Sequence, residues 1–129
     1  MINLHKKYKA SVMASMTVAK NNVKRWGIYS VLKKLDKQNF VISNVIEKPS
    51  IIEAPSTNAV IGRYILNKNI FKILEKQKKG KGGEIHITDS IKTMIDNRFL
   101  FIGHKFAGKY LDCGSMDGYI KSTLEIAKL

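Results

Sequence analysis

Apolar residues form short runs over much of the chain, with more strand than helix predicted at its front. Ser11–Val18 is short, apolar and flanked by charge, which is typical of a buried strand. Similar extended runs cover Trp26–Leu32, Phe40–Glu47, Ala59–Leu66 and Phe99–Phe106. The pattern therefore predicts a sheet built from these segments.

Helical spacing marks several of the remaining segments. Met1–Lys9 carries a loose helical pattern of apolar residues. Asn67 can cap a helix over Asn69–Lys78, and Thr88 can cap a second helix that follows it. Ser115 is in place to cap a last helix near the end of the chain. Strands and helices in this order predict a mixed α/β protein.

An acidic and a basic residue stand together where one of these strands ends. Glu47 and Lys48 directly precede Pro49, which biases Lys48 towards extended geometry and stops the strand. Ligands of open α/β sheets bind outside the carboxyl ends of the strands, so both side chains are well placed to face a ligand. The alternative is an exposed ion pair beside a turn. Ile51 and Ile52 predict that the loop after Pro49 packs against the protein.

Length and composition are those of an ordinary globular domain. The 129 residues suit one domain, residues 1–129, with 44% hydrophobic and 26% charged residues. No apolar run approaches the roughly 20 residues of a membrane span. His5–Lys9 followed by Ala10–Ala19 has the outline of a signal peptide, but a strand fits the second segment as well. The single cysteine, Cys113, excludes an intrachain disulfide and predicts a reducing, cytoplasmic location.

The net charge of +13 raises the question of a polyanionic partner. The lysines are scattered, and Lys78–Lys81 is the only dense run. No aromatic interleaving or helix-turn-helix pattern accompanies them, and lysine is weaker than arginine in bidentate base readout. A solvated lysine-rich surface is the better interpretation, so nucleic acid is disfavoured as a partner.

Other chemically interesting residues give ambiguous signals. Lys81–Gly83 suits either a phosphate-binding loop or a helix terminator, and its spacing does not match a nucleotide P-loop. His5, His86 and His104 have no metal-ligand spacing. Asp112 is a lone carboxylate before a helix, which could be a cap, a turn residue or half of a magnesium site.

Six motifs, in this order and spacing, carry a specific resemblance. The chain resembles the bacterial UTP–glucose-1-phosphate uridylyltransferases, within the sugar-phosphate nucleotidyltransferases, from about Leu4 to Ile126. The motifs are SVMA at Ser11–Ala14, WGIY at Trp26–Tyr29, VIEKP at Val45–Pro49, APSTNAVIGRYIL at Ala54–Leu66, GGEIHITDSI at Gly82–Ile91 and KYLDCGSMDGYIK at Lys109–Lys121.

The resemblance implies part of a three-layer, Rossmann-like nucleotidyltransferase fold with a mixed sheet. It also implies transfer of a uridylyl group from UTP to glucose 1-phosphate, which gives UDP-glucose and pyrophosphate. Gly27 would present its backbone to the sugar, and Glu47 would accept hydrogen bonds from sugar hydroxyls. Lys48 would neutralise the sugar phosphate during catalysis, and Asp112 would be a catalytic residue that holds magnesium.

The resemblance covers only the second half of such an enzyme. The glycine-rich loop that grips the nucleotide and the first magnesium aspartate have no counterpart here, so the amino-terminal nucleotide-binding half is absent. We expect a truncated or split enzyme that is inactive alone and exposes a sheet edge. The alternative is a non-catalytic module that binds sugar phosphates or UDP-sugars, or that serves in assembly.

The expected partners follow from this resemblance. They are glucose 1-phosphate, UTP and UDP-glucose, a separate chain that carries the missing half, and further copies of this chain. No membrane partner is expected.

Overall fold

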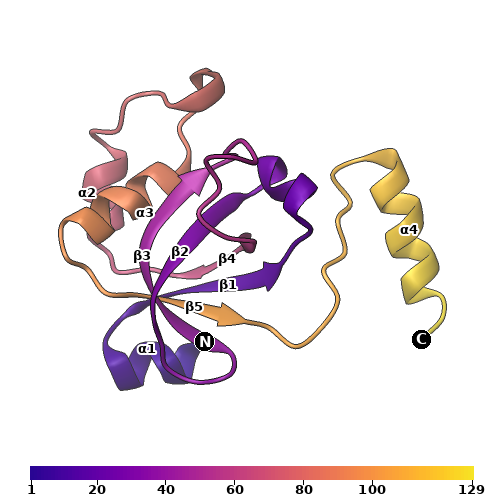
Figure 1. The fold of residues 1–129 in the computed structure, drawn as a ribbon, viewed down its shortest axis with the longest axis horizontal. Coiled ribbons are helices and arrows are strands. Elements are labelled where there is room, and N and C mark those ends of the chain that lie inside the picture. The colour runs from indigo at the N-terminus through magenta and orange to yellow at the C-terminus, as the bar shows by residue number, and fades with distance from the viewer.

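A computed structural model describes residues 1–129 and contains a five-stranded sheet (Figure 1). Every strand that the sequence predicts is present, with small changes at its ends. The first of them, at the segment with a signal-like outline, is a buried strand. The strands are β1 (Ser11–Thr17), β2 (Gly27–Lys34), β3 (Asn39–Glu47), β4 (Asn58–Ile65) and β5 (Phe101–Lys105).

The sheet is mixed and closes on itself. β1 pairs antiparallel with β4 and parallel with β5, and β2 and β3 form an antiparallel hairpin. Ile28 and Ala59 join β2 to β4, and the start of β3 pairs with β5, so the order β1-β4-β2-β3-β5 is a closed barrel. The expectation of an exposed sheet edge is therefore wrong. The reason is that β5 pairs with β1 on one side and with β3 on the other, while the single pair of Ile28 and Ala59 joins β2 to β4.

Helices lie on both faces of this sheet, as a three-layer fold requires. Neighbouring residues of β1 point to opposite faces, because side chains alternate along a strand. Val12 and Ile102 pack with Leu4 of the first helix, whereas Met13 and Phe101 belong to the larger core that the second and third helices cover. The helices are α1 (Ile2–Tyr8), α2 (Ile70–Leu74), α3 (Ile87–Asp96) and α4 (Met116–Ile126), and short 3₁₀ helices span Lys20–Arg25 and Lys81–Gly83.

Two of the predicted helix ends are wrong. The helix expected over Asn69–Lys78 ends at Leu74, because the residues that follow are charged or polar and offer no apolar face to bury. Lys81–Gly83 therefore does not terminate it. Thr88 does not cap α3 either: His86 occupies the cap position, and the Thr88 hydroxyl bonds to another strand instead.

The loop after β3 also differs from its prediction. Ile52 is 96% exposed and Ile51 is exposed too, so neither packs the loop against the protein. Pro49 is the residue of this loop that is fully buried. Lys48 has a φ of 43°, in the left-handed region, rather than the extended geometry expected before a proline. Its N–H donates to the carbonyl of Trp26 at 3.0 Å, which continues the β2–β3 pairing around the corner.

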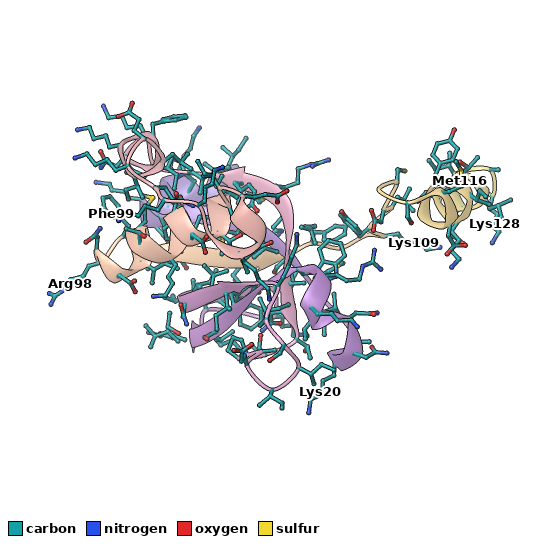
Figure 2. The ribbon with its side chains drawn as sticks, turned by 90° about the horizontal axis from the view of Figure 1, so that it is seen from above. Lys20, Arg98, Phe99, Lys109, Met116 and Lys128 are labelled. Carbon is teal, nitrogen blue, oxygen red and sulfur yellow. The ribbon has the colours of Figure 1, made fainter.

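Helix α4 stands apart from the rest of the molecule at the end of an extended segment (Figures 1 and 2). Ser115 caps it as predicted, since its side chain accepts a hydrogen bond from the N–H of Gly118 at 3.1 Å. Its large apolar residues are mostly exposed. None of the four helices has the length and apolar character needed to cross a bilayer.

Candidate functional site

A cleft of about 550 Å³ opens at the end of the β2–β3 hairpin. Gly27 begins β2 and Glu47 ends β3, and the two residues are paired across the hairpin. The chain approaching α3 forms another wall of the cleft. The lining residues are Arg25, Trp26, Gly27, Glu47, Val60, Ile61, Gly62, Arg63, Tyr64, Ile85, His86, Ile87, Thr88 and Tyr110.

The Glu47 carboxylate is held in this cleft by one short hydrogen bond. Its side chain is only 13% exposed, and Oε2 accepts from the Thr88 hydroxyl at 2.5 Å. Oε1 lies 3.9 Å from Nδ1 of His86, which is too long for a hydrogen bond. Burial raises the pKa of the Tyr64 phenol, and the negative charge of Glu47 raises it further. The carboxylate therefore also acts on this side chain. One carboxylate oxygen is thus fixed by the protein and the other is left open to the cleft.

Gly27 provides the space that Glu47 occupies. A Cβ atom at this position would lie 3.0 Å from the Thr88 methyl carbon and 3.2 Å from Oε2 of Glu47. Both distances are tighter than ordinary van der Waals contact, so a side chain here would displace the carboxylate or the threonine. The absence of a side chain keeps this end of the cleft accessible.

Lys48 lies beside the cleft but does not line it. Its side chain is exposed, and its carbonyl accepts a hydrogen bond from the Lys81 ammonium at 2.5 Å. A left-handed conformation costs a non-glycine residue about 1–2 kcal/mol. The bonds to Trp26 and Lys81 offset this cost and keep the corner in place. The ammonium group itself remains free to reach an anion near the end of β3.

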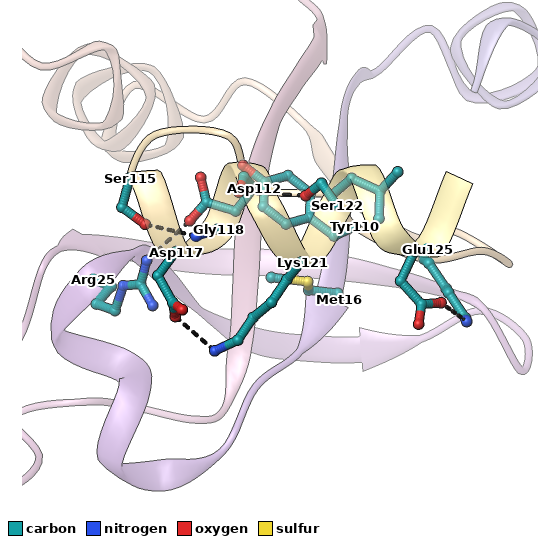
Figure 3. A pocket seen from close by; sticks show the side chains of 12 residues that line it. Met16, Arg25, Tyr110, Asp112, Ser115, Asp117, Gly118, Lys121, Ser122 and Glu125 are labelled. Atoms are coloured by element: carbon teal, nitrogen blue, oxygen red, sulfur yellow. Dashed lines mark hydrogen bonds and ion pairs between the residues drawn. The ribbon is translucent and has the colours of Figure 1, made fainter. Parts of the chain in front are cut away.

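Asp112 lies in a neighbouring cleft of about 480 Å³, between α4 and the 3₁₀ helix before β2 (Figure 3). Its Oδ2 accepts from Nη2 of Arg25 at 2.9 Å, and its Oδ1 accepts from the N–H of Gly114 at 3.0 Å. Arg25 and Tyr110 line both clefts, so the two are adjacent. The structure therefore brings Gly27 and Glu47 together in one cleft and places Asp112 in the adjacent cleft.

The side chains of residues 1–129 do not make up a metal site by themselves. The structure has no group of three or more histidine, cysteine, aspartate or glutamate side chains that could hold a metal ion. Asp112 is a single carboxylate already engaged by Arg25. Magnesium in nucleotide-transfer sites usually takes one or two carboxylates together with phosphate oxygens and water. Asp112 fits one carboxylate position of such a site and no more.

Sequence reasoning missed the part of the site that α3 and the segment before it provide. Thr88 and His86 both lie in the GGEIHITDSI motif, but the local pattern predicts only a helix cap at Thr88 and gives His86 no metal-ligand spacing. Nothing in the sequence links Trp26 to Tyr110, although their rings meet edge to face with centroids 5.1 Å apart. These contacts join residues far apart in sequence, so no local pattern indicated them.

Comparison with known proteins places this geometry in a family. The model of the family described as nucleotidyl transferase matches residues 1–128. The chain belongs to this family. The resemblance to UTP–glucose-1-phosphate uridylyltransferases is also confirmed. The Pseudomonas aeruginosa protein of that name is 37% identical over 123 residues, which cover 95% of this chain and 43% of the relative. The putative one from Methanocaldococcus jannaschii is 34% identical and is covered to 44%.

Solved structures confirm the α/β nucleotidyltransferase fold with its mixed sheet. A crystal structure of UDP-glucose pyrophosphorylase complexed with UDP-glucose matches 98% of this nucleotidyl transferase chain with a TM-score of 0.91 and 40% identity. A UTP-bound enzyme from Acinetobacter baumannii matches with a TM-score of 0.80 and 29% identity. The matches cover 47% and 42% of those chains. The chain thus spans less than half the length of its relatives.

Proposed function

We propose that this chain supplies the sugar-phosphate side of a uridylyltransferase that makes UDP-glucose and pyrophosphate from UTP and glucose 1-phosphate. The observation that carries the proposal is the Gly27–Glu47 pair at the cleft, in a chain 40% identical to a protein crystallised with UDP-glucose. A glycine beside a fixed carboxylate gives a sugar room to approach and an acceptor for its hydroxyls.

Glu47 and Lys48, at the end of β3, each have a role in this reaction. A phosphate oxygen of glucose 1-phosphate attacks the α-phosphorus of UTP in line, and pyrophosphate leaves with the bonding electrons. Glu47 holds the sugar through the oxygen that Thr88 leaves open. Lys48 places a positive charge near the attacking phosphate, which offsets the negative charge that the two substrates bring together.

Asp112 is the carboxylate that we propose for a magnesium ion. Nucleotidyl transferases generally use a divalent metal. Asp112 would hold it together with a second carboxylate and the groups that bind the triphosphate, all from the part of the fold that this chain does not span. Arg25 pairs with Asp112 in this structure, so its guanidinium would lose that partner if Asp112 held a metal. A guanidinium released in this way is suited to binding a phosphate.

We propose that the uncovered face of α4 receives the rest of the fold, supplied by a separate chain. Met116 is 75% exposed, and Tyr119, Ile120 and Leu124 are also exposed. Apolar helix faces are normally buried. The structural match covers 98% of this chain, so the placement of α4 belongs to a fold whose solved chains are more than twice as long. Assembly of further copies of this chain is the alternative.

A binding or assembly role without catalysis is the second candidate. It is favoured by the single carboxylate of the candidate metal position and by the absence of any larger ligand cluster in residues 1–129. Release of pyrophosphate from UTP and glucose 1-phosphate separates the two. We expect none from the chain alone, and release when the amino-terminal part of the Pseudomonas aeruginosa relative is added. Ligand binding with no release in that mixture supports the second candidate.

Binding of glucose 1-phosphate by the purified chain tests the site itself. Isothermal titration of wild-type protein, Lys48→Ala and Lys33→Ala compares two exposed lysines of the same hairpin. A charge-assisted bond to phosphate contributes about 1.5–3 kcal/mol, so Lys48→Ala should bind roughly 10–100-fold more weakly. Lys33→Ala should resemble wild type. Equal affinities for the two variants would remove Lys48 from the site.

We also propose a cytoplasmic location, since Cys113 is exposed and unpaired, as suits a reducing compartment. The lysines remain, in this proposal, a solvated surface rather than a nucleic-acid site.

A further inference from the structure

Thr88 makes an unusual contact for a residue in the first turn of a helix. It is the second residue of α3 and is 6% exposed. Hydroxyls at the start of a helix usually bond to the helix itself. The Thr88 hydroxyl instead donates to Oε2 of Glu47, which lies at the end of β3. The bond therefore links α3 to the end of β3.

Both branches of the Thr88 side chain contact the candidate sugar site. The hydroxyl holds Glu47, and the methyl carbon lies 3.0 Å from the place where a Cβ of Gly27 would be. The β-branched side chain has few rotamers, so fixing one branch fixes the other. Thr88 therefore cannot turn its hydroxyl away from Glu47 without also moving its methyl group from its place beside Gly27.

The geometry decides which carboxylate oxygen a ligand can use. Thr88 donates one hydrogen bond to Oε2, and His86 is too distant to bond to Oε1. A free carboxylate in a cleft could rotate and offer either oxygen in several directions. The bond to Oε2 fixes the plane of the carboxylate, so Oε1, which accepts no protein hydrogen bond, faces the cleft in a defined direction. A site with a defined acceptor discriminates between ligands that carry the matching hydroxyl and ligands that lack it.

We propose that Thr88 is a positioning residue that sets the sugar specificity of Glu47. This inference rests on the proposed function, because it assumes that Glu47 bonds a sugar hydroxyl. In this proposal Thr88 acts by orienting the Glu47 carboxylate and takes no part in binding the phosphate. Its removal should therefore change which sugar phosphates bind more than it changes the stability of the fold.

Isothermal titration with a panel of ligands tests this. The panel contains glucose 1-phosphate and its 2-, 3-, 4- and 6-deoxy analogues, each titrated into the 129-residue chain. Thr88→Val removes the hydroxyl and keeps the shape, and Thr88→Ser keeps the hydroxyl. Thr93→Val is the matched control, because the Thr93 hydroxyl on the same helix bonds only to the backbone carbonyl of Asp89.

Wild-type protein should bind one or two deoxy analogues at least tenfold more weakly than glucose 1-phosphate. Thr88→Val should bind glucose 1-phosphate about tenfold more weakly and lose that discrimination, because the lost bond to a charged group contributes of this order. Thr88→Ser and Thr93→Val should keep the wild-type ratios. Thermal unfolding of every variant identifies any effect that comes from a damaged fold.

Three outcomes overturn the proposal. Unchanged ratios in Thr88→Val would show that the carboxylate needs no positioning. An equal weakening of all ligands in both Thr88 variants would show a structural role only. A wild-type chain that binds none of the ligands would overturn the proposed function as well, whereas the first two outcomes leave it standing.

Discussion

Lys48 combines two unfavourable features in one residue. It is a non-glycine residue with a φ of 43°, and it directly precedes a proline. Such strain persists where the surrounding structure determines it, and it gathers at functional corners. Here the surrounding structure is the bond from its N–H to Trp26 and the bond from Lys81 to its carbonyl. The side chain therefore leaves the sheet in a direction that an extended residue would not give it.

Replacement of Lys48 by glycine should separate this strain from function. Lys48→Gly relieves the left-handed strain, and glycine gives back part of the gain as unfolded-state entropy, so the free energy of unfolding should rise by about 0.5–1 kcal/mol. Affinity for glucose 1-phosphate should fall because the ammonium is lost. Lys9→Gly, at another left-handed residue with a φ of 49°, is the control. Urea unfolding should show a similar gain in Lys9→Gly, with unchanged ligand binding. A loss of stability in Lys48→Gly would contradict the account.

Among the contacts between elements, Gly103 of β5 leaves the space that the Tyr29 ring of β2 fills. A Cβ on Gly103 would lie 2.8 Å from Cζ and from the hydroxyl oxygen of Tyr29. Tyr29 is fully buried in β2, and its hydroxyl lies 2.8 Å from the hydroxyl of Ser15 in β1. Burial raises the pKa of this tyrosine. The glycine thus lets three strands share one aromatic side chain.

Gly103→Ala should destabilise this packing by about 1–3 kcal/mol, because the extra methyl group has no free space. Gly108→Ala is the control, since its nearest neighbour is the half-exposed ring of Phe106, which can move. The midpoint of urea unfolding measures both. Equal midpoints for the two variants would show that Gly103 is not needed for closure.

A second contact between elements joins β5 to the start of β3. Nδ1 of His104 lies 2.8 Å from Oδ1 of Asn39, and the Asn39 amide donates to both carboxylate oxygens of Asp36. Burial lowers the pKa of His104, the N-terminal charge lowers it further, and Asp36 opposes the shift. The pKa of Asp36 is itself lowered, mainly by its hydrogen bond from Asn39.

Stability should therefore depend on pH through His104. Its folded-state pKa is below the ordinary value of 6.5, so its contribution is present above pH 6.5 and is lost as the pH falls through the folded pKa. Asp36 titrates below its ordinary value of 3.8, so it does not act in the same window. Urea unfolding between about pH 7 and pH 4 should show a smaller pH slope for His104→Gln than for wild type. The same slope in both proteins would assign the acid sensitivity to other groups.

In the whole molecule, α4 extends away from the sheet, whose strands pair in a closed ring (Figure 2). The closed sheet explains how residues 1–129 can form a core while spanning less than half of the related chains. Among the elements, α4 carries the most exposed large apolar side chains, which are Met116, Tyr119, Ile120, Leu124 and Ile126. A partner is expected to meet this helix.

A charge on the apolar face of α4 tests this expectation. Ile120→Lys should leave the free energy of unfolding within about 0.5 kcal/mol of wild type, because the side chain is already exposed. It should abolish co-purification with the amino-terminal part of the Pseudomonas aeruginosa relative. Lys128→Ala, at an exposed residue beyond the end of the helix, should co-purify normally. Normal association of Ile120→Lys would exclude this face as the contact.

Local sequence patterns are sufficient to predict the five strands, the family and the position of Glu47 at the end of β3. Strand periodicity located β1 to β5, and the VIEKP motif placed Glu47 at a strand end, because both signals lie within a few neighbouring residues. Three features could not be predicted from local patterns. The closure of the sheet, the left-handed Lys48 and the bond from Thr88 to Glu47 all depend on contacts between distant segments. A threonine at the start of a helix satisfies the same local rules whether it caps the helix or holds a carboxylate, and only the approach of β3 selects the second role.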